Sequence, residues 1–355
     1  MPIEPVLDVG PDADATHLLF RVADADRRLR GVRLYQEVRV PEDLLHFTWV
    51  DGVWELLLDR PEVDRVEYLL ELTHEDGSVE TTTDPANPRL VRGAFGDKSV
   101  LELPGYRTPL WLDQPAPEGA RRDVVVPARS LEEDLWCELW SPEGVADDAP
   151  HPLLVVHDGP EYDHISRLTT YLSAWIAAGN LPPLRAALLP PGARNERYSA
   201  DGAYTRALCL AVLPRLRAEV ATTATVGMGA SLGALAMLHA QRYRAGSFDA
   251  LFLQSGSFFH PSHDAHEKDF SRYERVVRSV ATVLRSGAHP SPVPTVMTCG
   301  TIEENIANNR IMARALAAQG YDVALHEVRD VHNYTAWRDA FDPWLTGLLR
   351  RVAGA

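Results

Sequence analysis

The stretch TATVGMGASLGALAML, residues 223–238, decides the fold class of the longer part of this chain. Within it, Gly229 to Gly233 reads G-x-S-x-G, between a short β-branched run and an Ala/Leu-rich run of helical character. Such a strand-to-helix turn exposes its serine, requires small neighbours, and places a helix N-terminus where negative charge develops. The short pattern alone also occurs in ordinary glycine-rich turns. The flanking strand and helix patterns favour the catalytic alternative, with Ser231 as the nucleophile.

Strand-like and helical patterns alternate around this turn. Strand-like runs occupy residues 124–128, 135–140, 153–157 and 187–190. Apolar residues recur at helical spacing in residues 171–178, 204–220 and 309–319. Because strands that alternate with helices form mainly parallel sheets, we expect an α/β-hydrolase domain.

The N-terminal part of the chain follows a different pattern. Short runs of alternating polar and apolar residues extend from Thr16 to Leu103, with turn signals at residues 51–52 and 75–77. This spacing predicts an all-β, immunoglobulin-like antiparallel sandwich. A chain of 355 residues also exceeds what one hydrophobic core usually serves. We therefore expect an N-terminal β-sandwich over residues 1–110 and a catalytic domain over residues 120–355.

A serine hydroxyl is a weak nucleophile until a neighbouring base takes its proton, so a histidine and an acid are required. His332 follows the strand-like ALHEV and precedes a predicted helix, where this fold places its catalytic histidine. A loop histidine without a chemical role is the alternative. Two adjacent carboxylates, Glu303 and Glu304, follow the strand-like VPTVMTCG. We favour Glu303 as the acid; Glu304 could instead cap the next helix or line the site.

An oxyanion hole needs two N–H donors. One is expected from Leu232, directly after the nucleophile, and the other from the loop after the first core strand. That loop reads Asp-Gly-Pro-Glu, and Pro160 has no N–H. Gly159 is therefore the expected second donor, and Glu161 is the alternative in the same loop.

Two further side chains are candidates for substrate binding. Arg194 follows a strand-like run and a turn, so it should lie near the strand ends, where open α/β sheets bind ligands. It could orient a substrate anion, or form a structural ion pair with Glu196 or another carboxylate. Tyr334 lies two residues after His332, and Trp337 and Trp344 at helical spacing favour helix packing. We expect Arg194, Tyr334 and Glu161 to line the substrate site.

Composition excludes several classes of partner. The formal net charge of −15 argues against nucleic acids and anionic membranes, which require basic surfaces. The three cysteines are far apart and fit neither a disulfide framework nor a metal site, so we predict no metal and no cofactor. No segment has the length of apolar sequence that spans a bilayer. These features predict a cytoplasmic protein and leave its oligomeric state open.

Several stretches resemble the enterochelin esterases and their esterase D relatives. In the N-terminal part these are YLLEL, DPANP and GDKSVLELPGY, at residues 68–72, 84–88 and 96–106. In the second part they are HDGPEY, R-x-E-x-Y, GMGASLGA, CGTIEEN and VHNYTAWRDAF, which begin at residues 157, 194, 227, 299 and 331. The resemblance covers both domains, and the last motif is quite specific.

This resemblance implies hydrolysis of the ester bonds of a catecholate siderophore, a trilactone that carries iron, with Ser231, Glu303 and His332 as the triad. Relatives with the same catalytic domain act on thioesters or aryl esters or transfer acyl groups, so a general carboxylesterase, thioesterase or acyltransferase is an alternative. A carbohydrate- or polymer-binding protein is another, with Trp49 and Trp54 of the sandwich as a sugar platform. Because all proposed chemical groups lie in the second domain, the first should affect substrate choice more than bond cleavage.

Overall fold

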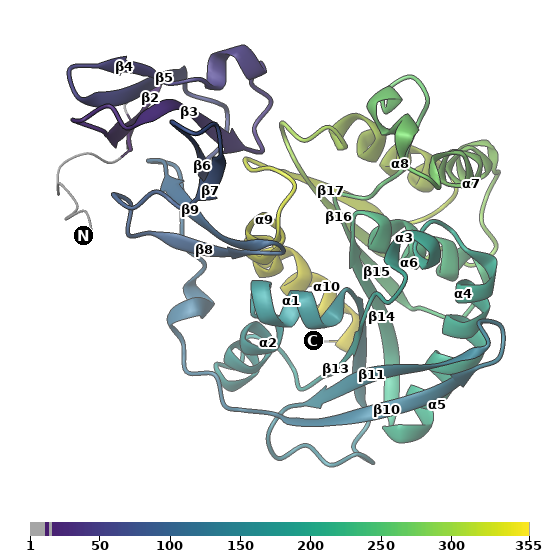
Figure 1. Ribbon diagram of the computed structural model, residues 1–355. Coiled ribbons are helices and arrows are strands. Elements are labelled where there is room, and N and C mark those ends of the chain that lie inside the picture. The colour runs from purple at the N-terminus through teal and green to yellow at the C-terminus, as the bar shows by residue number, and fades with distance from the viewer. Residues whose placement is uncertain (1–10, 14–15, 355) are drawn as a thin grey trace. The chain divides into compact units, whose positions relative to one another are not determined.

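The computed structural model describes residues 11–13 and 16–354. The chain divides into two compact units. The first comprises the described residues up to Arg107 together with Arg329–Asn333, and the second comprises Thr108–Val328 with the described residues from Tyr334 onward. Figure 1 labels the helices and strands of both units.

The first unit is built from two antiparallel sheets. One has the strand order β1-β2-β5-β4; the other has the order β3-β6-β9-β8, with β7 paired to β6. The strands are β1 (Asp12–Ala13), β2 (His17–Ala23), β3 (Leu29–Gln36), β4 (Thr48–Val50), β5 (Val53–Asp59), β6 (Arg65–His74), β7 (Val79–Thr82), β8 (Leu90–Gly93) and β9 (Gly96–Glu102). A short 3₁₀ helix spans Glu42–Leu45.

Apolar side chains that alternate along these strands form the core between the two sheets. In β2, Leu18 and Phe20 are buried while their neighbours are partly exposed. The ring of Phe20 packs edge-on against that of Tyr68 in β6, with 5.0 Å between centroids, and so joins one sheet to the other. The predicted antiparallel sandwich is confirmed.

The second unit contains an eight-stranded sheet with the order β10-β11-β13-β12-β14-β15-β16-β17. Strands β10, β11 and β13 pair antiparallel, and every other neighbouring pair is parallel. The strands are β10 (Ala120–Ala128), β11 (Glu133–Ser141), β12 (His151–His157), β13 (Arg185–Leu189), β14 (Thr222–Ala230), β15 (Ala250–Gln254), β16 (Thr295–Gly300) and β17 (Val323–Val328). This mainly parallel sheet is the one that the sequence predicts.

Helices cover both faces of the large sheet (Figure 1). They are α1 (Gly159–Ser166), α2 (Leu168–Ala177), α3 (Arg194–Arg197), α4 (Gly202–Ala207), α5 (Leu213–Glu219), α6 (Leu232–Tyr243), α7 (Tyr273–Arg285), α8 (Ile306–Ala318), α9 (Tyr334–Asp339) and α10 (Thr346–Ala353). Short 3₁₀ or π-helical turns span Leu110–Asp113, Leu208–Val212, Ala265–Asp269 and Phe341–Leu345. None of the helices in the described part of the chain combines the length and hydropathy that a bilayer crossing requires.

The central strands are apolar because they are buried on both faces. Along β12, Leu153 and Val155 pack in one hydrophobic cluster with α5, α6, α7 and α8. Leu154 and Val156 pack in the other with α2 and α10. A strand between two helical layers therefore reads as a continuous apolar run, without the alternation of the N-terminal strands. The α/β-hydrolase fold class is confirmed by this arrangement.

The division of the chain differs from a simple cut between two sequence segments. Arg329–Asn333, which lies between β17 and α9, groups with the N-terminal unit. This short segment contains His332, the predicted general base. The physical basis of this grouping is the buried ion pair between Arg65 and Asp330.

Candidate active site

Ser231 occupies a strained turn between β14 and α6. Its φ of 56° and ψ of −125° are unusual for a residue with a side chain, and such strain persists where the surrounding structure imposes it. The Ser231 N–H donates to the Gln254 carbonyl at 2.9 Å. A Cβ on Gly229 would lie 2.6 Å from the Gly233 backbone, so only glycine fits. This is the geometry of a nucleophile elbow.

The segment after β15 lies against the nucleophile. Ser231 Oγ and Ser257 Oγ are 3.0 Å apart, and the Ser257 N–H donates to the Ser231 carbonyl at 3.1 Å. Asn309 of α8 fixes this segment, since its amide accepts from Gly256 N at 3.1 Å and donates to Gly256 O at 2.9 Å. The loop that contacts the Ser231 hydroxyl is therefore fixed in position by its hydrogen bonds to Asn309.

Glu303 is buried on the neighbouring segment, which follows β16. Its Oε1 accepts hydrogen bonds from Ser255 Oγ and from Gly300 N, each at 2.7 Å. The Ser255 hydroxyl in turn accepts from Trp337 Nε1 at 3.0 Å. Only 5% of Glu303 is exposed. Two hydrogen bonds to one oxygen therefore fix the orientation of the Glu303 carboxyl group.

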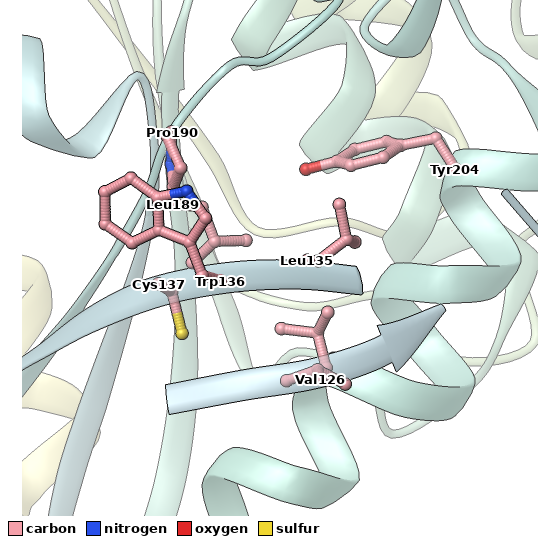
Figure 2. A pocket seen from close by; sticks show the side chains of 8 residues that line it. Val126, Leu135, Trp136, Cys137, Leu189, Pro190 and Tyr204 are labelled. Carbon is pink, nitrogen blue, oxygen red and sulfur yellow. The ribbon is translucent and has the colours of Figure 1, made fainter. Parts of the chain in front are cut away.

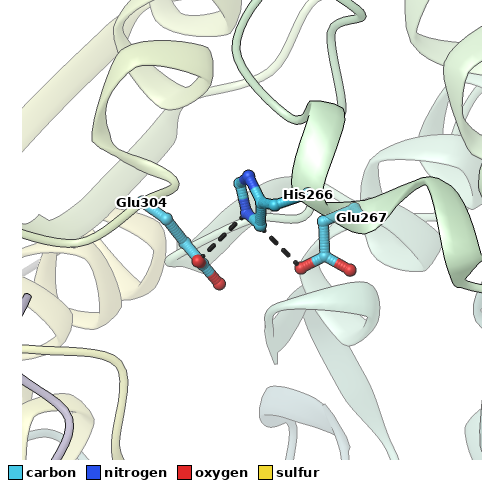
Figure 3. Close-up of side chains that lie close together, drawn as sticks. All are labelled: His266, Glu267 and Glu304. Carbon is cyan, nitrogen blue, oxygen red and sulfur yellow. Dashed lines mark ion pairs between the residues drawn. The ribbon is translucent and has the colours of Figure 1, made fainter. Parts of the chain in front are cut away.

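Glu304 has a different environment. Its Oε2 lies 3.0 Å from His266 Nε2, and the side chain is 39% exposed. Glu267 approaches the same imidazole at 3.9 Å, so three groups with metal-binding atoms lie together (Figure 3). The His266–Glu304 ion pair accounts for their proximity. Glu304 thus belongs to a surface ion pair, whereas Glu303 faces inward.

His332 lies in the loop Arg329–Asn333 and is partly buried. The loop begins where β17 ends, and α9 begins two residues after the histidine. Ser231 and Glu303 belong to the second unit, and His332 groups with the first. The role of His332 as the general base therefore stays a prediction.

Two helix N-termini begin at the same edge of the large sheet. Strands β12 and β14 are parallel neighbours, and α1 and α6 start just beyond their ends, at Gly159 and Leu232. The N–H groups of a first helical turn have no partner within the helix and attract negative charge. Pro160, which has no N–H, occupies the second position of α1. The N–H of Gly159, at the first position, is still present. Gly159 and Leu232 can thus supply the two expected donors.

The turn before α1 fits closely against neighbouring backbone. Asp158 adopts a left-handed conformation with φ of 51°. A Cβ on Gly159 would lie 2.4 Å from the Leu188 Cα atom of β13, so glycine is required here. His157 contacts the elbow, because its Nδ1 lies 3.0 Å from the Gly233 carbonyl. A carbonyl only accepts, so Nδ1 carries the proton.

His157 is completely buried in the second unit. Burial lowers the pKa of His157 to about 4, so the ring is neutral near pH 7. Its Nε2 accepts from the Tyr204 hydroxyl at 2.9 Å, and the Tyr198 ring stacks on it with 4.3 Å between centroids. Sequence reasoning assigned this histidine no role; its place behind the turn of α1 is structural.

Tyr204 also borders a small pocket next to the hairpin of β10 and β11. Figure 2 shows its lining, which includes Val126, Leu135, Trp136, Cys137 and Leu189. The pocket has a volume of about 10 Å³, which is about what a single water molecule needs. Its lining contains none of the predicted site residues, and it is too small for an ester substrate.

Arg194 is paired with a carboxylate at the turn of α1. Its Nε and Nη2 donate to the two oxygens of Asp158 at 2.9 and 2.8 Å, a bidentate ion pair. Although burial opposes it, this pairing raises the pKa of Arg194. The Arg194 side chain remains 32% exposed. Of the two roles left open for Arg194, the structure supplies the ion pair, with Asp158 as its partner.

Glu196 pairs elsewhere. It accepts from Arg272 and, at 2.6 Å, from Arg275 Nη1. Arg194, Arg272 and Glu196 itself border an open surface groove of about 440 Å³, which is also lined by Asn195 and Ser271. Two guanidinium groups thus lie at one groove, each already near a carboxylate.

Glu161 and Tyr334 lie near the ion pair between Arg194 and Asp158. Burial raises the pKa of Glu161, with a smaller contribution from the Asp158 charge. Glu161 Oε2 is buried, and no residue of the described chain donates a hydrogen bond to it. The Tyr334 ring packs edge-on against Tyr162 and Trp337, with 5.6 and 4.8 Å between centroids. Burial raises the pKa of Tyr334, so its hydroxyl stays protonated.

Sequence reasoning missed the groups that support the predicted ones. Ser255 and Ser257 lie in QSGS after β15, and Asp158 lies in the motif HDGPEY. A polar cluster directly after a buried parallel strand was the available signal, since the carboxyl ends of such strands form one edge. The roles of these residues required the folded structure, because their partners are distant in sequence.

Comparison with known proteins identifies relatives. A model of the Esterase family, with the description "Putative esterase", matches residues 128–348. The iron(III) enterobactin esterase of Dickeya dadantii (strain 3937) is 30% identical over 248 residues, which are 65% of this chain and 57% of that enzyme. The match therefore spans little more than half of that relative's length.

Solved structures resemble both units. The ferric enterobactin esterase of Salmonella typhimurium superposes with a TM-score of 0.77 at 19% identity, covering 98% of each chain. The enterobactin esterase of Shigella flexneri, solved in the presence of enterobactin, gives a TM-score of 0.73 at 17% identity, covering 97% of this chain and 96% of that one. At this level of identity the likeness establishes the fold.

Proposed function

This chain belongs to the Esterase family, and we propose that it is a serine esterase that hydrolyses the ester bonds of a catecholate siderophore. The observation that carries the reaction type is the Ser231 elbow, together with buried Glu303, which follows β16 and accepts a hydrogen bond from Ser255 of the segment next to the serine. The substrate class is supported by the identity to an iron(III) enterobactin esterase.

The proposed mechanism proceeds through an acyl-enzyme. Ser231 Oγ attacks the ester carbonyl carbon while His332 accepts the hydroxyl proton, and Glu303 stabilises the resulting imidazolium. The N–H groups of Leu232 and Gly159 stabilise the negative oxygen of the tetrahedral intermediate. The C–O bond then breaks, and His332 returns the proton to the departing alkoxide. Water attacks the acyl-enzyme in the same way and releases the acid.

The groove bordered by Arg194 and Arg272 offers two guanidinium groups to an anionic ligand. A ferric tris-catecholate is a trianion, which a chain of net charge −15 repels unless cations gather locally. Arg194 and Arg272 border the groove, and both are partly exposed. We place the reaction in the cytoplasm, where an enzyme meets an imported siderophore. The iron-bound form is the proposed substrate.

Two measurements test this proposal. A fluorophosphonate should label Ser231 stoichiometrically, and Ser231→Ala should lower hydrolysis by about 10³-fold or more with the fold intact. Purified protein should then be offered ferric and iron-free catecholate trilactones, an aryl ester and a thioester. Normal turnover by folded Ser231→Ala would disprove the mechanism. Hydrolysis of aryl esters without any cleavage of catecholate esters would favour a general esterase.

A further inference from the structure

The loop that carries His332 is anchored by a buried arginine of the sandwich. Arg65 begins β6, and its Nε and Nη2 donate to Asp330 Oδ2 at 3.1 and 2.7 Å. Its Nη2 also donates to Asn333 Oδ1 at 3.0 Å. Asp330 and Asn333 lie on either side of His332 in the chain. One guanidinium therefore holds both ends of the short segment that contains the histidine.

Arg65 and Asp330, the two residues that anchor the loop, are both buried. Arg65 is 1% exposed and Asp330 is 7% exposed. Arg65 Nη1 donates to Glu67, which lies two residues further along β6 and is also buried. Buried charges are stable only when they are paired and hydrogen-bonded. The position of the loop is therefore set by a network that tolerates little displacement.

The network continues to the partly exposed surface of the same unit. Asn333 Nδ2 donates to Glu37 Oε2 at 3.3 Å, and Glu37 also pairs with Lys98. Lys98 Nζ lies 3.8 Å from Glu67 Oε2, which closes a ring of five side chains with the neutral amide of Asn333 between Glu37 and Arg65. The ring connects the histidine loop with β6 and β9.

Backbone contacts fix the first residues of the loop. The Asp64 N–H donates to the Arg329 carbonyl at 2.9 Å, and Arg329 Nε donates to Asp64 Oδ1 at 3.0 Å. Within the loop, the Val331 N–H donates to Asp330 Oδ1 at 2.8 Å. Backbone and side-chain contacts thus restrain the residues before and after His332.

We propose that Arg65 and Asp330 are positioning residues that fix the loop carrying His332, the proposed general base. This inference rests on the proposed serine esterase function. It changes the expected division of labour, because loss of the anchor slows the cleavage of every ester, including substrates too small to need a second binding domain.

The test uses the full-length protein and a small neutral ester, p-nitrophenyl acetate. Asp330→Asn removes one charge at constant size, Arg65→Met removes the guanidinium, and Arg65→Lys keeps the positive charge with fewer donors. Asp330→Asn and Arg65→Met should lower kcat by about 10- to 100-fold with little change in KM, because a small misplacement of a catalytic group has effects of this size. Arg65→Lys should recover part of the loss.

The matched control lies on the same strand. Glu71 of β6 pairs with Arg33 of β3 at 2.6 Å and is partly exposed. Glu71→Gln should leave kcat within about twofold of the parent, as is usual for a surface substitution. Glu37→Ala is the second variant, in case a buried substitution prevents folding. It alters only the partly exposed end of the network, so the protein should stay folded. It should lower kcat by about threefold, the low end of what one hydrogen bond contributes, because the Asn333–Glu37 bond is long and the Arg65–Asp330 pair stays in place.

Circular dichroism and thermal melting establish which variants are folded. If the folded anchor variants, including Glu37→Ala, all keep kcat within about twofold of the parent, like Glu71→Gln, the positioning role is wrong. Ser231→Ala and His332→Ala are measured beside them. Hydrolysis retained by these two would refute the proposed function; hydrolysis lost by these two but retained by the anchor variants would refute the positioning role alone.

Discussion

Two adjacent carboxylates illustrate how burial separates residues of the same type. Glu303 accepts hydrogen bonds from Ser255 and Gly300 and is 5% exposed. Glu304 forms its ion pair with His266 and is 39% exposed on its side chain. A buried carboxylate acts in a medium of low dielectric, where its charge influences a neighbouring imidazole strongly. A surface carboxylate is screened by water and salt.

Glutamine at each position tests this difference. Glu303→Gln keeps an oxygen that can accept from Ser255 and Gly300, so the fold should persist while the negative charge is lost. We expect kcat to fall by about 10²- to 10⁴-fold, as when the acid of a triad is replaced by an amide. Glu304→Gln is the matched control and should have a small effect. Equal losses, or the reverse order, measured with an aryl ester would assign the acid to Glu304.

At the scale of elements, the site depends on two strands that end side by side. The parallel pairing of β12 and β14 brings the starts of α1 and α6 to one edge of the sheet. The close approach of α1 to β13 requires Gly159, because a Cβ there would lie 2.4 Å from Leu188 Cα. Backbone atoms cannot yield as a flexible side chain can. The position of this N–H donor is therefore set by packing between elements.

Gly159→Ala should displace the start of α1 and move its N–H away from the oxyanion. We expect kcat to fall by about 10²-fold or more, the usual effect of losing one donor. Gly202 begins α4 with no atom within 4 Å of an added Cβ. Gly202→Ala is thus the matched control, with activity near that of the parent. If the two alanine variants are equally active and equally stable, close packing does not govern the turn.

At the scale of the whole molecule, buried titratable groups make stability depend on pH. Burial lowers the pKa of five histidines, His151, His157, His239, His289 and His326. Below pH 6.5 the unfolded chain binds protons that these folded imidazoles do not, so their contribution to stability is lost as the pH falls. Burial raises the pKa of Asp84, Glu161 and Asp330, which acts in the opposite direction.

A single variant isolates the largest of the histidine effects. The pKa of His157 falls from 6.5 to about 4, which corresponds to about 3 kcal/mol of unfolding free energy lost between these two pH values. His157→Gln cannot titrate, so its stability should decrease by about 2 kcal/mol less than that of the parent between pH 7 and pH 4.5. Urea denaturation at both pH values measures this difference. Parallel pH dependence in the two proteins would show that His157 does not contribute.

Local sequence was sufficient for the fold class. The β-branched run, the small residues around Ser231 and the apolar helix after it act within a few residues of each other, so they specify a strand, a turn and a helix directly. The alternation along β2 and the continuous apolar run of β12 likewise report the faces that each strand buries. The one helix expected over residues 204–220 is divided into α4 and α5 by a π-helical turn at Leu208–Val212.

The sequence by itself determined the sandwich, the mainly parallel sheet and the order of the candidate serine, acid and histidine. Only the tertiary structure decided that Arg194 pairs with Asp158 and that Glu303 is buried while Glu304 is not. It also decided that the histidine loop belongs with the sandwich, through Arg65 and Asp330, which are 265 residues apart. No local pattern predicts such a pair, because ion pairing and burial depend on which segments the folded chain brings together.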